Sequence, residues 1–175
     1  NAFLVGEKGP IELTRDTLTS FKVCPFGGDA SSEDANEYGP YLFPTDHETT
    51  GLSAGLVNAE FSSVHLFYAS DSGGNGLDLY SLVGDGSSVP LNVGVPGSDD
   101  AYLSYSSDIT VCLFCSNRDG DFDIYSVEMS SDSTFPDALT EAAAAPTVSA
   151  VTALNSEYDD KCPYLFGDIV VFVSN

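Results

Sequence analysis

The sequence predicts an all-β repeat protein built from four-stranded antiparallel units. A hydrophobic share of 42% in 175 residues indicates an ordered protein with one sizeable core. The apolar runs are short and are separated by turns that contain glycine and proline, which is typical of strands. These runs also recur along the chain, which indicates a repeat architecture within a single domain, residues 1–175.

The clearest repeat is a hairpin of an apolar strand, a glycine turn and a second strand that opens with aspartate. Its first copy is His65-Leu-Phe-Tyr-Ala-Ser-Asp71 followed by Leu77-Asp-Leu-Tyr-Ser81. Its second copy is Cys112-Leu-Phe-Cys-Ser-Asn117 followed by Phe122-Asp-Ile-Tyr-Ser126. A third copy begins at Ile169-Val-Val-Phe-Val-Ser-Asn175, so the hairpin is the basic unit of the repeat.

Six residues of this motif are expected to be structural. Serine and aspartate side chains readily bond to the backbone of tight turns, so we expect the two aspartates to bond turn backbone near the serines. The tyrosine at the third position of the second strand should pack between neighbouring sheets, where its burial stabilises the fold most. The six residues are Ser70, Asp78, Tyr80, Ser116, Asp123 and Tyr125.

Further strands flank each hairpin. An upstream strand recurs at residues 40–43, 101–104 and 163–166, and a short closing edge strand is expected at 90–92 and 136–140. Proline at the start of such an edge strand does little harm.

The N-terminus fits the last two strands of a unit, because Phe3-Leu-Val-Gly-Glu7 matches Ser81-Leu-Val-Gly-Asp85. The chain is therefore expected to hold about three units' worth of strands. These are a half unit at 1–20, complete units at 36–95 and 98–142, and a half unit at 156–175.

The hairpin Ser116–Tyr125, and less closely Ser70–Tyr80, resembles the TolB-type (WD40-like) β-propeller repeat of bacterial periplasmic and surface proteins. The resemblance covers most of the chain and implies propeller blades of four antiparallel strands. Three blades are too few for a closed ring, since propellers have about four to eight. It therefore implies a partial propeller, completed by a longer chain or by assembly of a homo-oligomer. It also implies a protein-binding platform that is periplasmic, on the cell surface or secreted.

The charge excludes several partners. The chain has 27 acidic and five basic residues, a formal net charge of -22. Nucleic acid binding requires clustered lysine and arginine, so we expect no nucleic acid partner. No apolar run approaches about 18 residues, so we expect no membrane insertion. Such a field attracts cations or a basic protein surface, or it simply keeps the surface soluble. A protein partner is what the resemblance implies.

No cofactor is expected, and calcium is a weak alternative. Asp119 and Asp121 lie in an acidic turn whose closely spaced oxygens suit a hard cation, although Arg118 in the same turn counts against a metal. Catalysis has little basis, because His47 and His65 are the only histidines and the sequence has no glycine-flanked nucleophilic serine.

The segment from Pro44 to Ser62 is the best candidate for a binding element, since functional variation in repeat scaffolds collects in loops. It is longer than the equivalent connection in the second unit. Its apolar residues could form an exposed patch or pack back on the sheet as a lid. They are Leu52, Leu56, Val57 and Phe61.

Two of the four cysteines are expected to be structural. Cys112 and Cys115 lie three apart on a predicted strand, so they should point to opposite faces and behave as small buried hydrophobes. Cys24 and Cys162 each precede a proline, and whether they form a disulfide is left open by the sequence.

The leading functional hypothesis is a non-enzymatic, extracytoplasmic binding or scaffold module that acts through protein–protein interaction. One alternative is the propeller portion of a secreted hydrolase, a peptidase or glycosidase, whose catalytic residues lie outside this chain. Another is a carbohydrate-binding surface protein, with tyrosine or phenylalanine stacking on the sugar because the chain has no tryptophan.

Overall fold

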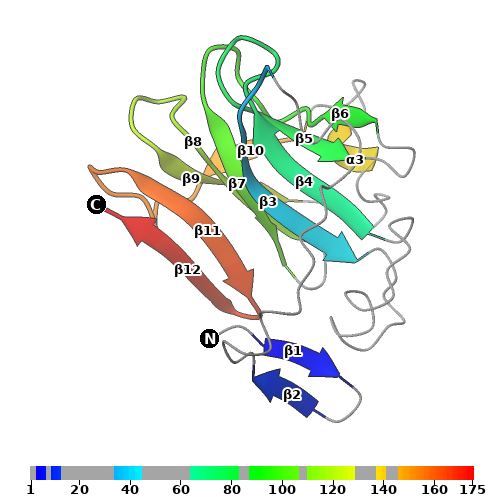
Figure 1. Cartoon of the computed structure of the whole chain (residues 1–175). Coiled ribbons are helices and arrows are strands. Elements are labelled where there is room, and N and C mark those ends of the chain that lie inside the picture. The colour runs from blue at the N-terminus through cyan, green and yellow to red at the C-terminus, as the bar shows by residue number, and fades with distance from the viewer. Residues whose placement is uncertain are drawn as a thin grey trace.

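The chain folds into antiparallel β-sheets (Figure 1), which confirms the all-β prediction. The computed structural model describes residues 3–6, 9–12, 34–44, 64–82, 87–106, 110–128, 137–140 and 146–175. These residues form twelve strands and one helix of four residues, α3 (Asp137–Thr140). No helix in them is long and apolar enough to cross a membrane.

Two four-stranded sheets form the centre of the structure. The first sheet contains β3 (Glu37–Pro44), β4 (Val64–Ser70), β5 (Asp78–Leu82) and β6 (Ser88–Pro90). Each strand pairs antiparallel with the strand before it in the chain, which makes the sheet a simple meander.

The second sheet repeats this order. It contains β7 (Asp100–Tyr105), β8 (Val111–Ser116), β9 (Asp123–Glu128) and β10 (Val148–Ala150), again as an antiparallel meander. The register repeats too, because Ser70 lies opposite Asp78 in the first sheet as Ser116 lies opposite Asp123 in the second.

Two hairpins complete the described strands. The N-terminal hairpin pairs β1 (Phe3–Gly6) with β2 (Gly9–Glu12), and the C-terminal hairpin pairs β11 (Asp160–Phe166) with β12 (Ile169–Ser174).

The closing strand predicted at residues 136–140 is wrong. Asp137–Thr140 forms helix α3, with Leu139 fully buried in the core, and β10 takes the fourth place in the sheet. Alanine and leucine favour a helical turn, and tertiary burial of Leu139 reinforces it. The second unit therefore extends to Ala150 rather than ending at residue 142.

Each first strand carries a β-bulge at the same position. The bulged residue has a left-handed backbone in all three cases, with φ of 55° at Gly39, 56° at Tyr102 and 54° at Cys162. This conformation costs a residue with a side chain about 1–2 kcal/mol. Its recurrence at tyrosine and cysteine shows that the repeated sheet geometry, rather than the preference of the residue, sets the bulge.

An asparagine–aspartate pair closes the open end of each four-stranded sheet. In the first sheet, Asn36 donates from its backbone N and its Nδ2 to the two carboxylate oxygens of Asp71, both at 2.8 Å. In the second sheet the residue types are exchanged. The backbone N of Asp99 donates to Asn117 Oδ1 at 2.7 Å, and Asn117 Nδ2 donates to Asp99 Oδ2 at 3.1 Å.

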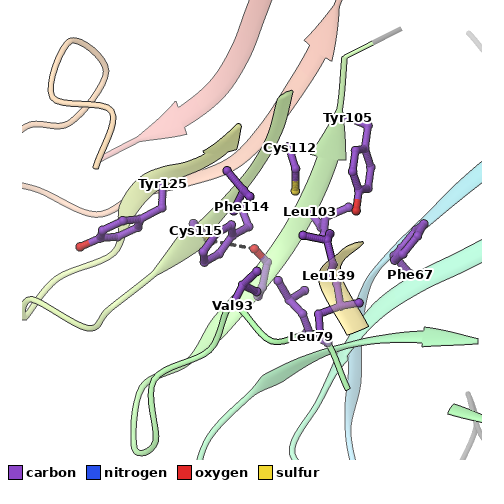
Figure 2. Close-up of a cluster of buried hydrophobic side chains, with 14 residues drawn as sticks. Phe67, Leu79, Val93, Leu103, Tyr105, Cys112, Phe114, Cys115, Tyr125 and Leu139 are labelled. Atoms are coloured by element: carbon purple, nitrogen blue, oxygen red, sulfur yellow. Dashed lines mark hydrogen bonds between the residues drawn. The ribbon is translucent and has the colours of Figure 1, made fainter. Parts of the chain in front are cut away.

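Successive units pack face to face in one recurring arrangement. Strand β7 packs against β3, β4 and β5, and β11 packs against β7, β8 and β9, so each new first strand lies across the preceding sheet (Figure 1). Figure 2 shows the main core between the two sheets, where Phe67 and Leu79 from the first meet Leu103 and Phe114 from the second.

Three of the four cysteines lie in described segments. Cys112 and Cys115 are fully buried in the main core, as predicted for small hydrophobes, and desolvation raises the pKa of each thiol to about 12. Cys162 is exposed and is a free thiol, whereas Cys24 lies outside the described residues.

Backbone hydrogen bonds join the first sheet to the second. Leu77, just before β5, donates its N–H to Asp99 Oδ1 at 2.9 Å. Its carbonyl accepts the N–H of Asp100 at 2.7 Å. Gly76 lies against the same segment with φ of 108°, and a Cβ there would overlap the carbonyl oxygen of Ser98.

The second sheet joins the C-terminal hairpin in the same way. Phe122, just before β9, donates its N–H to Asp159 Oδ1 at 3.1 Å and accepts the N–H of Asp160 at 2.6 Å. The two sheet junctions are therefore equivalent in both their donors and their acceptors.

The junction predicts unequal effects of two substitutions in one turn. Gly74→Ala should cost about 1–2 kcal/mol of stability, since φ is 74° but no atom lies within 4 Å of a new Cβ. Gly76→Ala should cost about 1–3 kcal/mol more, because a fixed backbone oxygen blocks the methyl group. Urea unfolding of both variants measures the difference, and equal losses would show that the junction does not constrain this turn.

Candidate functional site

The predicted binding loop lies outside the described residues. None of its four apolar side chains falls in a described segment, so the structure does not test whether they form a patch or a lid. They are Leu52, Leu56, Val57 and Phe61.

Each motif serine accepts a hydrogen bond from the turn that follows its own strand, β4 or β8. Ser70 Oγ accepts the N–H of Ser72 at 3.2 Å, and Ser116 Oγ accepts the N–H of Arg118 at 3.3 Å. For the aspartates, the structure shows only that Asp123 Oδ1 is buried without a hydrogen-bond partner among the described residues, so their expected bonds to the turn backbone remain a prediction. The serine, lying at the strand end itself, reaches the turn amide two residues on.

The two motif tyrosines differ in burial. Tyr125 is 3% exposed in the main core, stacks on Phe114 with ring centroids 6.0 Å apart, and donates its hydroxyl to Asp119 Oδ2 at 2.6 Å. Tyr80 is half-buried and stacks on Tyr68, with centroids 5.7 Å apart, in a smaller cluster. The main core therefore contains Tyr125, whereas Tyr80 packs against the smaller cluster.

An acidic residue opens the first strand of every unit. These residues are Glu37, Asp100 and Asp160, and each lies opposite the strand-end serine or its equivalent. Asp100 and Asp160 are fully buried, which is costly for a carboxylate unless it is paired.

Arg118 pairs with Asp100 at the first junction. Its Nη2 donates to Asp100 Oδ1 at 2.7 Å and to the carbonyl of Val93 at 3.0 Å. The guanidinium carbon lies 5.3 Å from the ring centroid of Phe114 and 4.6 Å from that of Tyr125. Stacking on two rings and donating to a buried carboxylate places the arginine inside the fold rather than on the surface.

The other oxygen of Asp100 is also bonded. Asp100 Oδ2 accepts the hydroxyl of Ser98 at 2.9 Å and the N–H of Val95 at 3.3 Å. Asp78 lies nearby, and desolvation followed by repulsion from Asp100 raises its pKa. The first junction is therefore an acidic pair in which one carboxylate is bonded by an arginine that is 12% exposed.

The second junction has the same acidic pair with a different result. Asp160 Oδ2 accepts the N–H of Ser156 at 2.7 Å and its hydroxyl at 2.9 Å. Desolvation opposes ionisation of Asp160, but hydrogen bonds from Ser174 and then from Ser156 lower its pKa below the ordinary value. Desolvation, then repulsion from Asp121, Asp160 and Asp119, raises the pKa of Asp123.

The lysine beside this junction is bonded elsewhere. Lys161 Nζ lies 2.9 Å from Asp159 Oδ2 and 4.2 Å from the ring centroid of Phe122. The described residues contain no group of three or more histidine, cysteine, aspartate or glutamate side chains placed to hold a metal ion. Asp119, one of the two weak calcium candidates, is the acceptor of the Tyr125 hydroxyl; the other is Asp121.

The C-terminal hairpin presents an apolar face to solvent. Tyr164 lies opposite Val171 and Phe166 lies opposite Ile169, so these four side chains share one face, together with Val173. They are between 52% and 71% exposed. We call these five residues the hairpin face.

The same positions are covered in both complete sheets. The counterparts of Val171 are Phe67 and Leu113, which are 0% and 4% exposed, against 58% for Val171. Each counterpart lies under the first strand of the next unit, because β7 covers the first sheet and β11 the second. Within the described residues, nothing equivalent covers the hairpin face.

Sequence reasoning missed both the pairing of Arg118 with Asp100 and the hairpin face. Arg118 lies in a turn, where a charged residue is ordinarily solvated, and only the position of Asp100 in space reveals its partner. The hairpin face had a signal in the continuous apolar run Ile169–Val173, but such a run also suits a strand that is covered on both faces.

Comparison with known proteins adds no relative. No protein-family model, curated protein or solved structure matches the chain.

The first junction predicts that Arg118→Ala destabilises the protein strongly. It leaves the buried carboxylate of Asp100 uncompensated, which typically costs about 3–5 kcal/mol. Adding Asp100→Asn should recover part of that loss, because no buried charge then remains unpaired. Chemical denaturation of the single and the double variant measures their free energies of unfolding, and a loss below about 1 kcal/mol in Arg118→Ala would contradict the pairing.

The second junction predicts a pH-dependent gain from Asp123→Asn. The pKa of Asp123 is higher in the folded protein than its ordinary value of 3.8, so folding favours the protonated form and stability is lost as pH rises through the folded pKa. An amide fixes a neutral side chain, so the melting temperature should rise by about 1–2 °C at pH 7 and by less toward pH 3.8.

Asp71→Asn is the matched control, since hydrogen bonds from Asn36 lower the pKa of Asp71. The ionised Asp71 side chain stabilises the fold at pH values above its ordinary pKa, and this stabilisation is lost as pH falls through its lowered pKa. The substitution should therefore lower the melting temperature at pH 7. Shifts of the same sign in both variants would refute the assignment.

Proposed function

We propose that this chain is part of a β-propeller and acts as a non-enzymatic, extracytoplasmic protein-binding module, with the hairpin face as its contact surface. Two meanders in sequential order, packed through equivalent junctions, support the propeller, together with the resemblance of Ser116–Tyr125 to the TolB-type repeat. That resemblance also supports the location outside the cytoplasm.

The observation that carries the function is the exposure of the hairpin face. Contiguous apolar residues that remain exposed in a folded protein commonly mark an interaction site. The five residues include Tyr164 and Phe166, and aromatic side chains contribute strongly to protein interfaces. The equivalent faces in this molecule are covered by β-structure, which supports a protein as the occupant.

The charge indicates the kind of protein that fits. At a net charge of -22, the chain attracts a basic partner and increases the rate of encounter with it. A second copy of this chain carries the same charge, so electrostatic repulsion opposes self-association. The proposed partner therefore offers an apolar surface with basic residues around it.

Glutamate at two positions of the hairpin face tests the function. Val171→Glu with Val173→Glu should weaken binding of a purified partner by at least about tenfold, because two charges would be desolvated in an apolar contact. Partners are first identified on the immobilised wild-type chain from the extracytoplasmic fraction of the source cells. Isothermal titration calorimetry with each purified partner then gives the affinity.

Val95→Glu is the control, because Val95 is also an exposed valine, 42% accessible, and lies outside the hairpin face. It should bind as the wild type does. Equal affinity of the wild type and the double variant for every partner would contradict the proposal, and circular dichroism establishes that each variant is folded.

A further inference from the structure

We propose that the first sheet contains a binding site for an arginine side chain of another protein, formed by Glu37, Ser70 and Tyr80. The inference goes beyond the proposed function, because these residues lie on a different sheet from the hairpin face. It rests on a comparison with the second sheet, which holds an arginine of its own in the equivalent arrangement.

The second sheet shows such a site with its arginine in place. Arg118 donates from Nε to Ser116 Oγ at 2.9 Å and from Nη2 to Asp100 Oδ1 at 2.7 Å. Its guanidinium carbon lies 5.3 Å from the ring centroid of Phe114 and 4.6 Å from that of Tyr125. A strand-end serine, a carboxylate that opens the first strand and two stacked rings therefore hold one guanidinium.

The first sheet has a counterpart of each of these groups. Glu37 lies opposite Ser70 across β3 and β4, as the carboxylate and the serine of the filled site lie opposite each other across β7 and β8. Tyr68 and Tyr80 stack with ring centroids 5.7 Å apart, and the two rings of the filled site stack at 6.0 Å. The remaining arginine contact, a bond to the carbonyl of Val93, comes from the segment before β7, and the corresponding segment before β3 is described only from residue 34.

Ser72 takes the place of the arginine in the first sheet. Ser70 Oγ accepts the N–H of Ser72 at 3.2 Å, as the serine of the filled site accepts the N–H of Arg118 at 3.3 Å. The two turns therefore begin with the same backbone hydrogen bond, so the side chain of Ser72 starts where that of the arginine starts. Ser72 is exposed, and an arginine from outside can approach the site beside it.

Glu37 is the group that requires a cation. Its Oε1 is buried and has no hydrogen-bond partner among the described residues, whereas the equivalent Asp100 Oδ1 is bonded by the arginine. Buried carboxylate oxygens are ordinarily bonded, because desolvation without a partner is costly. A guanidinium suits this site better than an ammonium, since its planar fork can donate to a carboxylate and a hydroxyl while it stacks on a ring.

Another protein is the best source of this arginine. The described residues contain two basic side chains, Arg118 and Lys161, and each already pairs with an aspartate. The turn residues Ser72–Asn75 are exposed, and the net charge of -22 attracts cationic groups toward them. Arginine is also enriched in protein interfaces, where it often dominates the binding energy.

The first test fills the site from within the chain. Ser72→Arg should raise the melting temperature by at least about 3 °C, because it supplies a charged hydrogen bond to Glu37. In a Glu37→Gln background the same substitution should give little of this rise. Asn75→Arg, an arginine at another exposed residue of the same turn, should change the melting temperature by no more than about 2 °C. Equal shifts from the two arginine variants, or an undiminished shift in the Glu37→Gln background, would overturn the inference.

The second test measures binding directly, with the tripeptide Gly-Arg-Gly with blocked termini as the probe. Heteronuclear NMR of the wild type should show saturable shifts at the amide of Ser72 and its neighbours, with a dissociation constant on the order of 1–10 mM. Gly-Lys-Gly carries the same charge and should bind at least about threefold more weakly, because an ammonium lacks the planar fork. Equal binding of the two tripeptides would show attraction by charge alone and would sink the proposal.

Protein variants locate the bound arginine. Glu37→Gln should weaken binding of Gly-Arg-Gly at least about tenfold, since it removes the charged acceptor. Glu128→Gln, the same change at an exposed residue at the end of β9, should leave binding unaltered. Ser72→Arg should abolish binding because it fills the site, whereas Asn75→Arg should retain it. Equal affinity of Glu37→Gln and the wild type would refute the contact.

The same material separates two other occupants. Calcium that raises the melting temperature of the wild type but not of Glu37→Gln would replace the arginine by a metal. Binding of Gly-Arg-Gly by Arg15→Gln but not by the wild type would make a residue of the chain itself the occupant. Either result overturns the inference but leaves the function assigned to the hairpin face standing, because that function is judged by Val171→Glu with Val173→Glu.

Discussion

At each sheet junction, the residue before the third strand of one unit makes two hydrogen bonds to the next unit. Its N–H donates to an aspartate carboxylate, and its carbonyl accepts the N–H of the residue that follows this aspartate. These two bonds fix the distance and the angle between one unit and the next. The left-handed bulges, and the packing of each first strand on the preceding sheet, recur together with these two hydrogen bonds. The acceptor is a carboxylate and the aspartate that follows it is fully buried, so each junction places a buried acidic side chain beside a partly exposed one.

The two junctions differ in how the unfavourable burial of a carboxylate is offset. Arg118 offsets it at the first, with its guanidinium between two aromatic rings and a buried aspartate. At the second junction, Asp123 Oδ1 is buried without a hydrogen-bond partner among the described residues, and desolvation, together with repulsion from Asp121 and Asp160, raises the pKa of Asp123. The exposed hairpin face belongs to the hairpin that begins at this second junction. An uncovered apolar surface and an acidic pair without an arginine therefore occur at the same end of the described structure.

The strands and their order could be predicted from the sequence, because the Ser-turn-Asp hairpin has a local cause. A serine at a strand end bonds a turn amide two residues away, and this information is contained in a few neighbouring residues. The partner of Arg118 depends on a residue 18 positions away, which no local pattern reveals. Likewise, Val171 and Phe67 are both apolar strand residues, and only the packing of the next unit makes one exposed and the other buried. The error at Asp137–Thr140 has the same origin, since burial of Leu139 decided the outcome.

The exchange of asparagine and aspartate between the two sheet ends has an evolutionary consequence. Asn36 with Asp71 and Asp99 with Asn117 make the same closure, although each position differs in residue type between the copies. A single substitution at either site would bring two carboxylates or two amides together, so the pair must change jointly or through a weakened intermediate. A comparison of the two copies one position at a time therefore scores both positions as differences, although the closure that each pair makes is the same.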